Sequence, residues 1–273
     1  MRSLDLSARI AAVVLGVLVI VAALSALTGL GGDPSALAGG RLEPPSPEHW
    51  LGTDGLGRSE LARLLQGIGT TLVLSAVAVL LTSIIAVLLG VVAGYFGGLF
   101  GDGIMRVVDV LYSFPALVLA ILVAALLGPG RTAALASIVL ITVPLMTRMV
   151  RIGAASVARR DFVTAARISG VPAWRIMLRH VLPNVAGTVV VQGSYALSLG
   201  ILIEGGLSFL GYGVQLPQSS LGSLVQDGAL YFTAAPWLLF APGVVLVVAI
   251  CAINLLGDGL RDRFEPRGTG SLS

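Results

Sequence analysis

The chain has 273 residues, of which 56% are hydrophobic and only 11% are charged, and its formal net charge is +3. This composition excludes an ordinary soluble domain and indicates an integral membrane protein. All 17 basic residues are arginines, so a Walker A loop, which needs a lysine on the nucleotide phosphates, is excluded and we expect the chain not to hydrolyse ATP itself.

The N-terminal part predicts one membrane anchor and one large loop. Residues 1–9 are expected to lie in the cytoplasm, and an uncharged apolar run follows at 10–30. The apolar region of a signal peptide has about 7–15 residues, so a run of about 20 favours an uncleaved spanning helix. Residues 31–70 are polar and rich in proline at first, which predicts an extracytoplasmic loop. Near its end, Ser59 can cap a helix.

The remaining apolar runs predict a core of five spanning helices within residues 71–257. Pro115 and Pro144 are expected to kink two of these helices, and residues 97–105 are expected to form a tight turn. The expected spans are 71–95, 107–127, 132–150, 185–203 and 237–256, with a cytoplasmic hairpin at 159–183, an outer loop at 204–236 and a cytoplasmic tail at 258–273.

Three polar residues in or beside these spans are candidates for a translocation path. Asp109 lies three residues after Arg106, which could instead neutralise it in a purely structural pair. Glu204 follows the fifth span, where it is either an interfacial carboxylate that reaches water or a residue at the mouth of the path. Asn254 in the sixth span is the third candidate.

Residues 159–183 form a polar segment that has helical order of its own. Asp161 can cap or charge the start of a short helix. Phe162, Ala165, Ala166 and Ser169 then recur at helical spacing and predict one apolar face of mostly small residues.

A second short helix completes this predicted hairpin. Gly170 can end the first helix, and Trp174 and Val181 share one side of the second helix until Pro183 ends it. A basic amphipathic segment beside a membrane can also be an interfacial helix that rests on anionic headgroups. The residues alone leave these two interpretations open.

The arginines indicate the orientation of the chain. With six spans and a cytoplasmic N-terminus, 13 of the 17 arginines lie in the cytoplasm, as the positive-inside rule requires. The excess of positive charge therefore needs no nucleic-acid partner. His49 and His180 fall on opposite sides of the membrane in this map, so we expect neither a metal site nor a Ser-His-Asp triad, and no cofactor.

The predicted hairpin carries a resemblance to a known family. Ala165-Ala166, Gly170 and residues 181–183 resemble the Glu-Ala-Ala…Gly…Ile-Leu-Pro loop of ABC importer permeases, in which a coupling helix docks on a separate cytoplasmic ATPase. Thr164 stands where that loop has glutamate.

Three further motifs follow the same family in the same order. Residues 49–63, 206–217 and 254–262 resemble segments of the C-type permease subunit of dipeptide, oligopeptide and nickel ABC importers. Ser59 stands where that family commonly has aspartate, and Gly205 and Leu221 replace an alanine and a tryptophan.

The resemblance implies an all-α permease of the type I ABC importer fold, with six transmembrane helices in a bacterial inner membrane and both termini cytoplasmic. The implied partners are a second, similar permease subunit that completes a heterodimer, two cytoplasmic ATPase subunits and an extracytoplasmic substrate-binding protein. Dipeptides or oligopeptides are the expected cargo, with nickel chelates or glutathione-like compounds as alternatives. An ion-gradient secondary transporter and a non-transporting scaffold are the alternatives from other classes. The implied ATPase-coupling residues are Asp161, Phe162, Thr164, Ala165, Ala166, Gly170 and Trp174.

Overall fold

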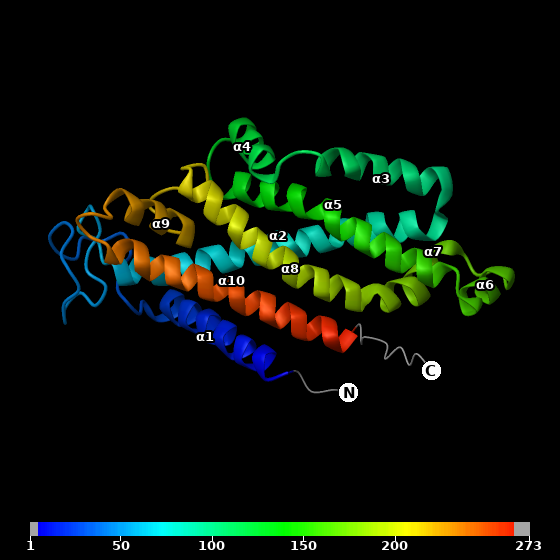
Figure 1. Ribbon diagram of the computed structural model, residues 1–273, viewed down its shortest axis with the longest axis horizontal. Helices are drawn as coiled ribbons and strands as arrows, with labels where there is room; N and C mark the ends of the chain where they lie inside the picture. Colours follow the sequence, from blue (N-terminus) through cyan, green and yellow to red (C-terminus); the bar gives the residue numbers. More distant parts are fainter. Residues whose placement is uncertain (1–4, 265–273) are drawn as a thin grey trace, which may run out of the picture.

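The computed structural model describes residues 5–264, which form an elongated bundle of helices (Figure 1). No strand is formed in this range, only two isolated bridges within residues 37–59, so the all-helical fold class is confirmed. The outermost parts of the predicted cytoplasmic ends, residues 1–4 and 265–273, lie outside the described residues. The helices are α1 (Leu6–Thr28), α2 (Glu60–Phe96), α3 (Gly98–Tyr112), α4 (Ala116–Leu127), α5 (Arg131–Ala158), α6 (Asp161–Ile168), α7 (Ala173–Ile176), the π-helical turn η1 (Met177–Val181), α8 (Leu182–Phe209), α9 (Leu221–Leu230) and α10 (Trp237–Phe264).

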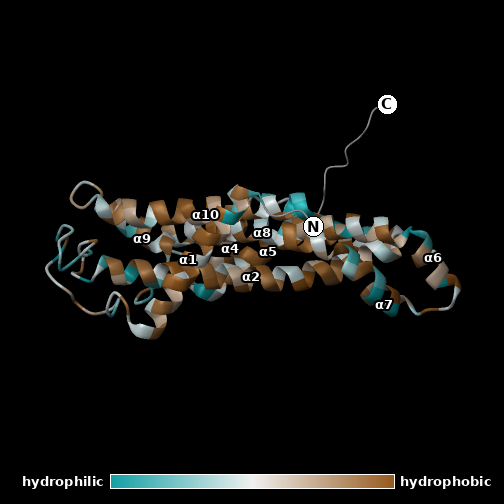
Figure 2. Ribbon diagram, turned by 90° about the horizontal axis from the view of Figure 1, so that it is seen from below, coloured by the Kyte–Doolittle hydropathy of each residue, from teal (hydrophilic) through white to brown (hydrophobic). Residues whose placement is uncertain are grey.

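Within residues 5–264, five helices are long and apolar enough to cross a membrane, and the bent pair of α3 and α4 would be a sixth span. Hydrophobic residues dominate the middle of the bundle, whereas hydrophilic residues gather in the loops at one end and around α6 and α7 at the other (Figure 2). The helices also run beyond the predicted spans. Thus α2 begins at Glu60 rather than residue 71, because Ser59 is its N-cap and accepts a hydrogen bond from the Ala62 N–H.

The helix pair of α2 and α5 lies at the centre of the bundle and has the most extensive contact. Two glycines of α2 allow this close approach. A Cβ atom added at Gly94 would lie 2.6 Å from the Arg151 carbonyl oxygen and 2.7 Å from the Ala154 Cβ. At Gly90 it would lie 2.8 Å from the Val150 Cβ. The two backbones are therefore in contact with no room for a side chain.

We predict that Gly94→Val lowers the yield of folded protein, because overpacking of this kind costs about 1–3 kcal/mol. The measurement is the monodisperse fraction in size-exclusion chromatography after detergent extraction. Gly103→Val on α3 is the matched control, since an added Cβ there meets nothing within 4 Å. Equal yields of the two variants would contradict the packing described above.

The expected tight turn at 97–105 is wrong, and the region of the expected span at 107–127 contains a sharp break rather than a kink within one helix. Only Gly97 and Gly98 turn the chain, with φ of 60° and 52°, and α3 begins at Gly98. The chain then breaks between Tyr112 and Ala116, and α3 and α4 meet at 87°. Pro115 explains this break, because it disfavours helical geometry in the preceding residue and starts α4 as its N-cap.

Pro183 does not end a helix, which corrects the predicted boundary of the hairpin. It lies in the first turn of α8, and helical structure continues from Ala173 to Phe209 through η1. The π-helical turn over Met177–Val181 ends two residues before this proline. It changes the hydrogen-bond pattern close to the position where the proline cannot donate. The second arm of the hairpin is therefore the start of a long helix rather than an independent short one.

Candidate functional site

The short helix α6 lies at one extremity of the bundle, where it connects α5 to α7 (Figure 1). Asp161 is the first residue of α6, where its negative charge interacts favourably with the helix dipole. Arg160 rather than Asp161 occupies the N-cap position. Gly170 follows the helix with a φ of 74°, a conformation that favours glycine, and its N–H donates to the Arg167 carbonyl oxygen at 3.1 Å. The predicted start and stop of the helix are thus confirmed.

The faces of α6 differ from the sequence-based expectation in an informative way. Val163 is the residue that anchors the helix, since it is 0% exposed and belongs to an apolar cluster that includes Ile176 and Val181. Ala166 packs against the same cluster and is half-buried. Ala165, by contrast, is exposed. The apolar periodicity therefore correctly predicts a helix, but it does not separate the residues that contact the chain from those that face outward.

Most of the predicted coupling residues lie on the outside of the hairpin. Trp174 is 56% exposed and Phe162 is 42% exposed, and Ile168, which the sequence-based prediction omits, is 83% exposed. The Arg175 guanidinium lies 5.2 Å from the Trp174 ring centroid, so a cation borders the apolar surface. Asp161, Thr164, Ala165 and Gly170 are exposed as well. We refer to this exposed set together with Phe162, Ile168 and Trp174 as the hairpin surface.

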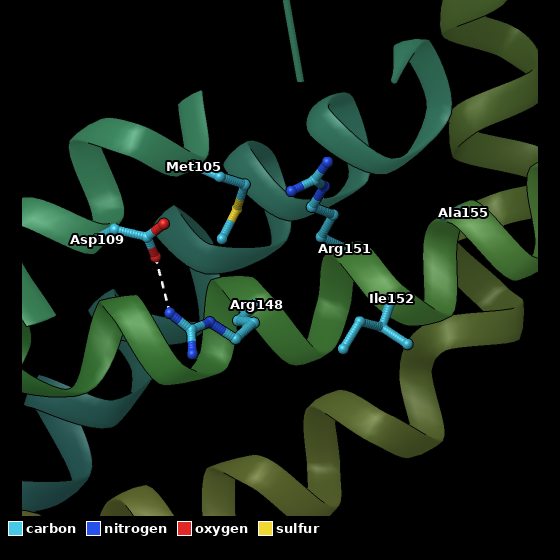
Figure 3. Close-up of a pocket in the computed structure, with 6 residues that line it drawn as sticks. All are labelled: Met105, Asp109, Arg148, Arg151, Ile152 and Ala155. Atoms are coloured by element: carbon cyan, nitrogen blue, oxygen red, sulfur yellow. Dashed lines mark hydrogen bonds and ion pairs between the residues drawn. The ribbon is translucent and has the colours of Figure 1, made fainter. Parts of the chain in front are cut away.

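Asp109 lies in a different place, in a pocket between α3 and α5 (Figure 3). Its Oδ1 accepts a hydrogen bond of 2.7 Å from Arg148 of α5, so the expected pairing with Arg106 is wrong. The packing of α3 against α5 explains the difference, because it brings Asp109 and Arg148 together although they are far apart in sequence. The pocket is lined by Met105, Asp109, Arg148, Arg151, Ile152 and Ala155.

Glu204 is fully buried, with 0% of the residue exposed, whereas the sequence predicts an exposed position. Its two carboxylate oxygens accept hydrogen bonds from Ser208 at 2.6 Å and from Thr71 at 3.0 Å. The Thr71 hydroxyl also accepts from the Leu221 N–H at 3.0 Å. Glu204 therefore connects α8 to α2 and to the start of α9, and the expectation that it reaches water is wrong.

Asn254 is half-buried on α10. Neither Asn254 nor Glu204 lines the pocket of Asp109, so the structure does not bring the three candidate path residues together.

A buried ionic cluster at the opposite end of the bundle was not predicted from the sequence. Arg63 of α2 is 1% exposed and donates to Asp54 at 2.7 Å and to Asp227 of α9 at 2.9 Å. Its Nε also donates to Ser219 at 3.1 Å, and Arg58 donates to Asp54 at 2.7 Å. These residues, which we call the outer clamp, join the loop before α2 to the segment that leads into α9.

The ionisation of Asp54 suits this role. Burial alone would raise the pKa of Asp54. Its carboxylate, however, accepts hydrogen bonds from the backbone N–H groups of Arg58 and Leu56 and from the Arg58 side chain, and it lies near the positive charge of Arg63. Together these interactions outweigh burial and lower the pKa below the ordinary 3.8. Because the pKa of Asp54 is lower in the folded than in the unfolded chain, its ionisation stabilises the fold at any pH above the ordinary pKa. This stabilisation is lost as the pH falls through the folded-state pKa. Asp54 is therefore charged at neutral pH and can accept the hydrogen bonds from Arg58 and Arg63.

Comparisons with known proteins agree on one family. The chain is 36% identical to the dipeptide transport system permease protein DppC of Alkalihalophilus pseudofirmus, over 83% of this chain and 75% of that protein. It is 38% identical to the oligopeptide transport system permease protein OppC of Mycobacterium tuberculosis, over 82% of this chain and 78% of that protein.

A solved structure shows the same fold. The MetNI methionine ABC transporter, in an inward-facing conformation, matches with a TM-score of 0.60 at 18% identity, over 74% of this chain and 95% of that one. The family model described as "binding-protein-dependent transport system inner membrane component" matches residues 86–269, which include α5, the hairpin, α8 and α10. The chain therefore belongs to the binding-protein-dependent transport system inner membrane components, the permease subunits of ABC importers.

Proposed function

We propose that this chain is a permease subunit that imports dipeptides or oligopeptides and is driven by separate ATPase subunits. The relatives named above are peptide permeases, which supports this substrate class. The observation that carries the mechanism is the hairpin surface. It exposes Phe162 and Ile168 on α6, which Val163 anchors to the chain, and Trp174 on α7. An apolar, preformed surface of this kind at a polar end of a membrane protein suits a protein partner.

The hairpin can transmit motion because it is joined rigidly to two long helices. Val163 packs with Val157 of α5 and with Ile176 and Val181 of the helical segment that continues into α8. When the ATPase pair closes on ATP, movement of α6 is passed to α5 and α8, which tilt and switch access of the path from outside to inside. The proposed coupling residues are Asp161, Phe162, Thr164, Ala165, Ala166, Gly170 and Trp174, of which the half-buried Ala166 holds the helix in place.

The proposed assembly contains a second, similar permease subunit, two ATPase subunits on the hairpin side and a substrate-binding protein on the side of the outer clamp. This arrangement places both termini and the hairpin in the cytoplasm of a bacterium, in agreement with the distribution of arginines. Asp109 and Asn254 are proposed to border the path. Glu204 is assigned instead to the hydrogen bonds between α2, α8 and α9.

The proposal is tested by uptake of a labelled tripeptide into proteoliposomes that contain both permeases, the ATPases and the binding protein. We expect uptake that requires ATP inside the vesicle and is unchanged when proton and sodium gradients are collapsed. Uptake that follows an ion gradient without ATP would contradict the proposal and favour a secondary transporter. Uptake of glutathione or a nickel chelate in preference to the peptide would contradict the proposed substrate class alone.

A further inference from the structure

The pocket between α3 and α5 is lined by three charged side chains, Asp109, Arg148 and Arg151, and Asp102 pairs with Arg151 from outside this lining. Arg148 donates to Asp109 at 2.7 Å, and Arg151 donates to Asp102 at 2.6 Å (Figure 3 shows the first pair). The side chains of the first pair are 43% and 53% exposed, and those of the second are 30% and 58% exposed. The charges are thus accessible, unlike Arg63 and Asp54 of the outer clamp, whose side chains are 1% and 3% exposed.

The pocket lies close to one end of the part of α5 that can cross the membrane. Arg148 follows Arg131, the first residue of α5, by 17 positions, which corresponds to about 26 Å along the helix. This is close to the thickness of a hydrocarbon core, about 30 Å. Charged side chains in spanning helices usually line a water-filled cavity and mark the route of a substrate.

The two arginines have hydrogen-bonding capacity left over. Each guanidinium has five N–H donors, yet within residues 5–264 Arg148 donates one hydrogen bond to Asp109 and Arg151 one to Asp102. The Tyr112 ring, whose centroid lies 5.1 Å from the Arg148 guanidinium carbon, holds that group in place. Two oriented guanidinium groups with free donors suit a carboxylate, which they can bind in a bidentate manner.

The other features of the pocket select a small zwitterion. Its volume is about 350 Å³, and Met105, Ile152 and Ala155 supply apolar wall. Asp109 contributes a negative charge beside the arginines, and Asp102, which pairs with Arg151 but does not line the pocket, brings the sum of the four charges to zero. A site of this composition disfavours a simple anion but matches a short peptide, which has a carboxylate at one end and an ammonium group at the other.

We infer that Arg148 and Arg151 form a transient binding site in the translocation path for the C-terminal carboxylate of a passing peptide, with Asp109 facing its ammonium group. This inference rests on the proposed function. Because water and salt reach all of these charges, the binding is weak, as a path requires if the peptide is to leave again. The carboxylate competes with Asp109 for Arg148, so binding also loosens the contact between α3 and α5.

The test is binding of trialanine and of trialanine amide to the complete complex in lipid nanodiscs without binding protein or ATP, measured by saturation-transfer NMR. We expect Arg148→Gln to weaken binding of the free acid on the order of tenfold and to change binding of the amide little, since one charged hydrogen bond is lost. Asp109→Asn breaks the same ion pair but keeps the guanidinium, so the preference for the acid over the amide should persist. Arg106→Gln, an exposed arginine on α3 outside the pocket, is the matched control.

Three results would overturn the inference. Equal weakening of both peptides by Arg148→Gln and Asp109→Asn would show that the pair only holds α3 against α5. No binding of either peptide to the wild-type complex would exclude the site. An effect that is present with phosphatidylglycerol and disappears in phosphatidylcholine alone would assign the pocket to lipid headgroups. Failure of the proposed function is recognised separately, because it abolishes ATP-driven uptake by the wild type.

Discussion

Replacing Ala165 by tryptophan should abolish ATP-driven peptide uptake while the subunit still folds and inserts. Ala165 is exposed on α6, so the indole adds bulk to the hairpin surface without entering the cluster around Val163. A bulky group on a docking surface prevents close packing with the partner, and we expect transport to fall by at least about tenfold. The measurement is uptake into proteoliposomes, normalised to the amount of correctly folded subunit.

Two companion variants make this result interpretable. Ala166→Trp should also abolish uptake, but Ala166 is half-buried, so this variant is expected to lower the yield of folded protein as well. Ser156→Trp, at an exposed position on α5 before the hairpin, should leave uptake near the wild-type level. Normal uptake by Ala165→Trp at a normal yield would show that the hairpin surface does not couple ATP hydrolysis to transport.

Replacing Arg63 by alanine should release the outer end of the bundle. Arg63 holds Asp54 and Asp227 together while it is 1% exposed, and removing one partner of a buried ion pair costs about 3–5 kcal/mol because the remaining charge is left without compensation. We expect residues 31–59 to become sensitive to proteolysis in detergent, and the thermal unfolding midpoint of the subunit to fall.

Arg41→Ala provides the control for this prediction. Arg41 belongs to the same loop but is exposed and donates to the Gly55 carbonyl oxygen at 2.6 Å, so its loss should change stability by less than about 1 kcal/mol. Arg63→Lys should be intermediate, because an ammonium group cannot reproduce the planar geometry of a guanidinium. Protease resistance that is the same in Arg63→Ala and Arg41→Ala would mean that the clamp does not hold the loop.

The sequence predicts the helices of this fold well where long apolar runs or local capping residues determine them. Ser59, Asp161 and Gly170 act through neighbours a few residues away, and the structure places the start of α2 and both ends of α6 where these residues indicate. Pro115 shows the limit of this reasoning. It predicts a disturbance of the helix, but the bend of 87° between α3 and α4 depends on how both helices pack on the rest of the bundle.

The functional side chains were harder to predict because their partners are distant in sequence. Asp109 has a nearby arginine at position 106, yet it pairs with Arg148 across two helices. Glu204 follows an apolar run, which predicts exposure, but Thr71 and Ser208 satisfy its carboxylate inside the protein. On α6, apolar periodicity alone does not identify Val163 as the buried anchor, because the direction of the helix relative to the bundle decides which face is covered.

The most direct test of coupling through the hairpin is cysteine crosslinking in native membranes. Cys251 is the single cysteine, so Cys251→Ala gives a background in which a single introduced cysteine carries the crosslinker. The two positions are Ala165→Cys on α6 and Ala234→Cys in the segment that joins α9 to α10, which lies at the opposite end of the bundle (Figure 1). We expect the tagged subunit to crosslink to an ATPase subunit from position 165 and not from position 234, as identified by mass spectrometry. Crosslinking of the ATPase from position 234, or from neither position while the ATPase still co-purifies, would contradict docking on the hairpin surface.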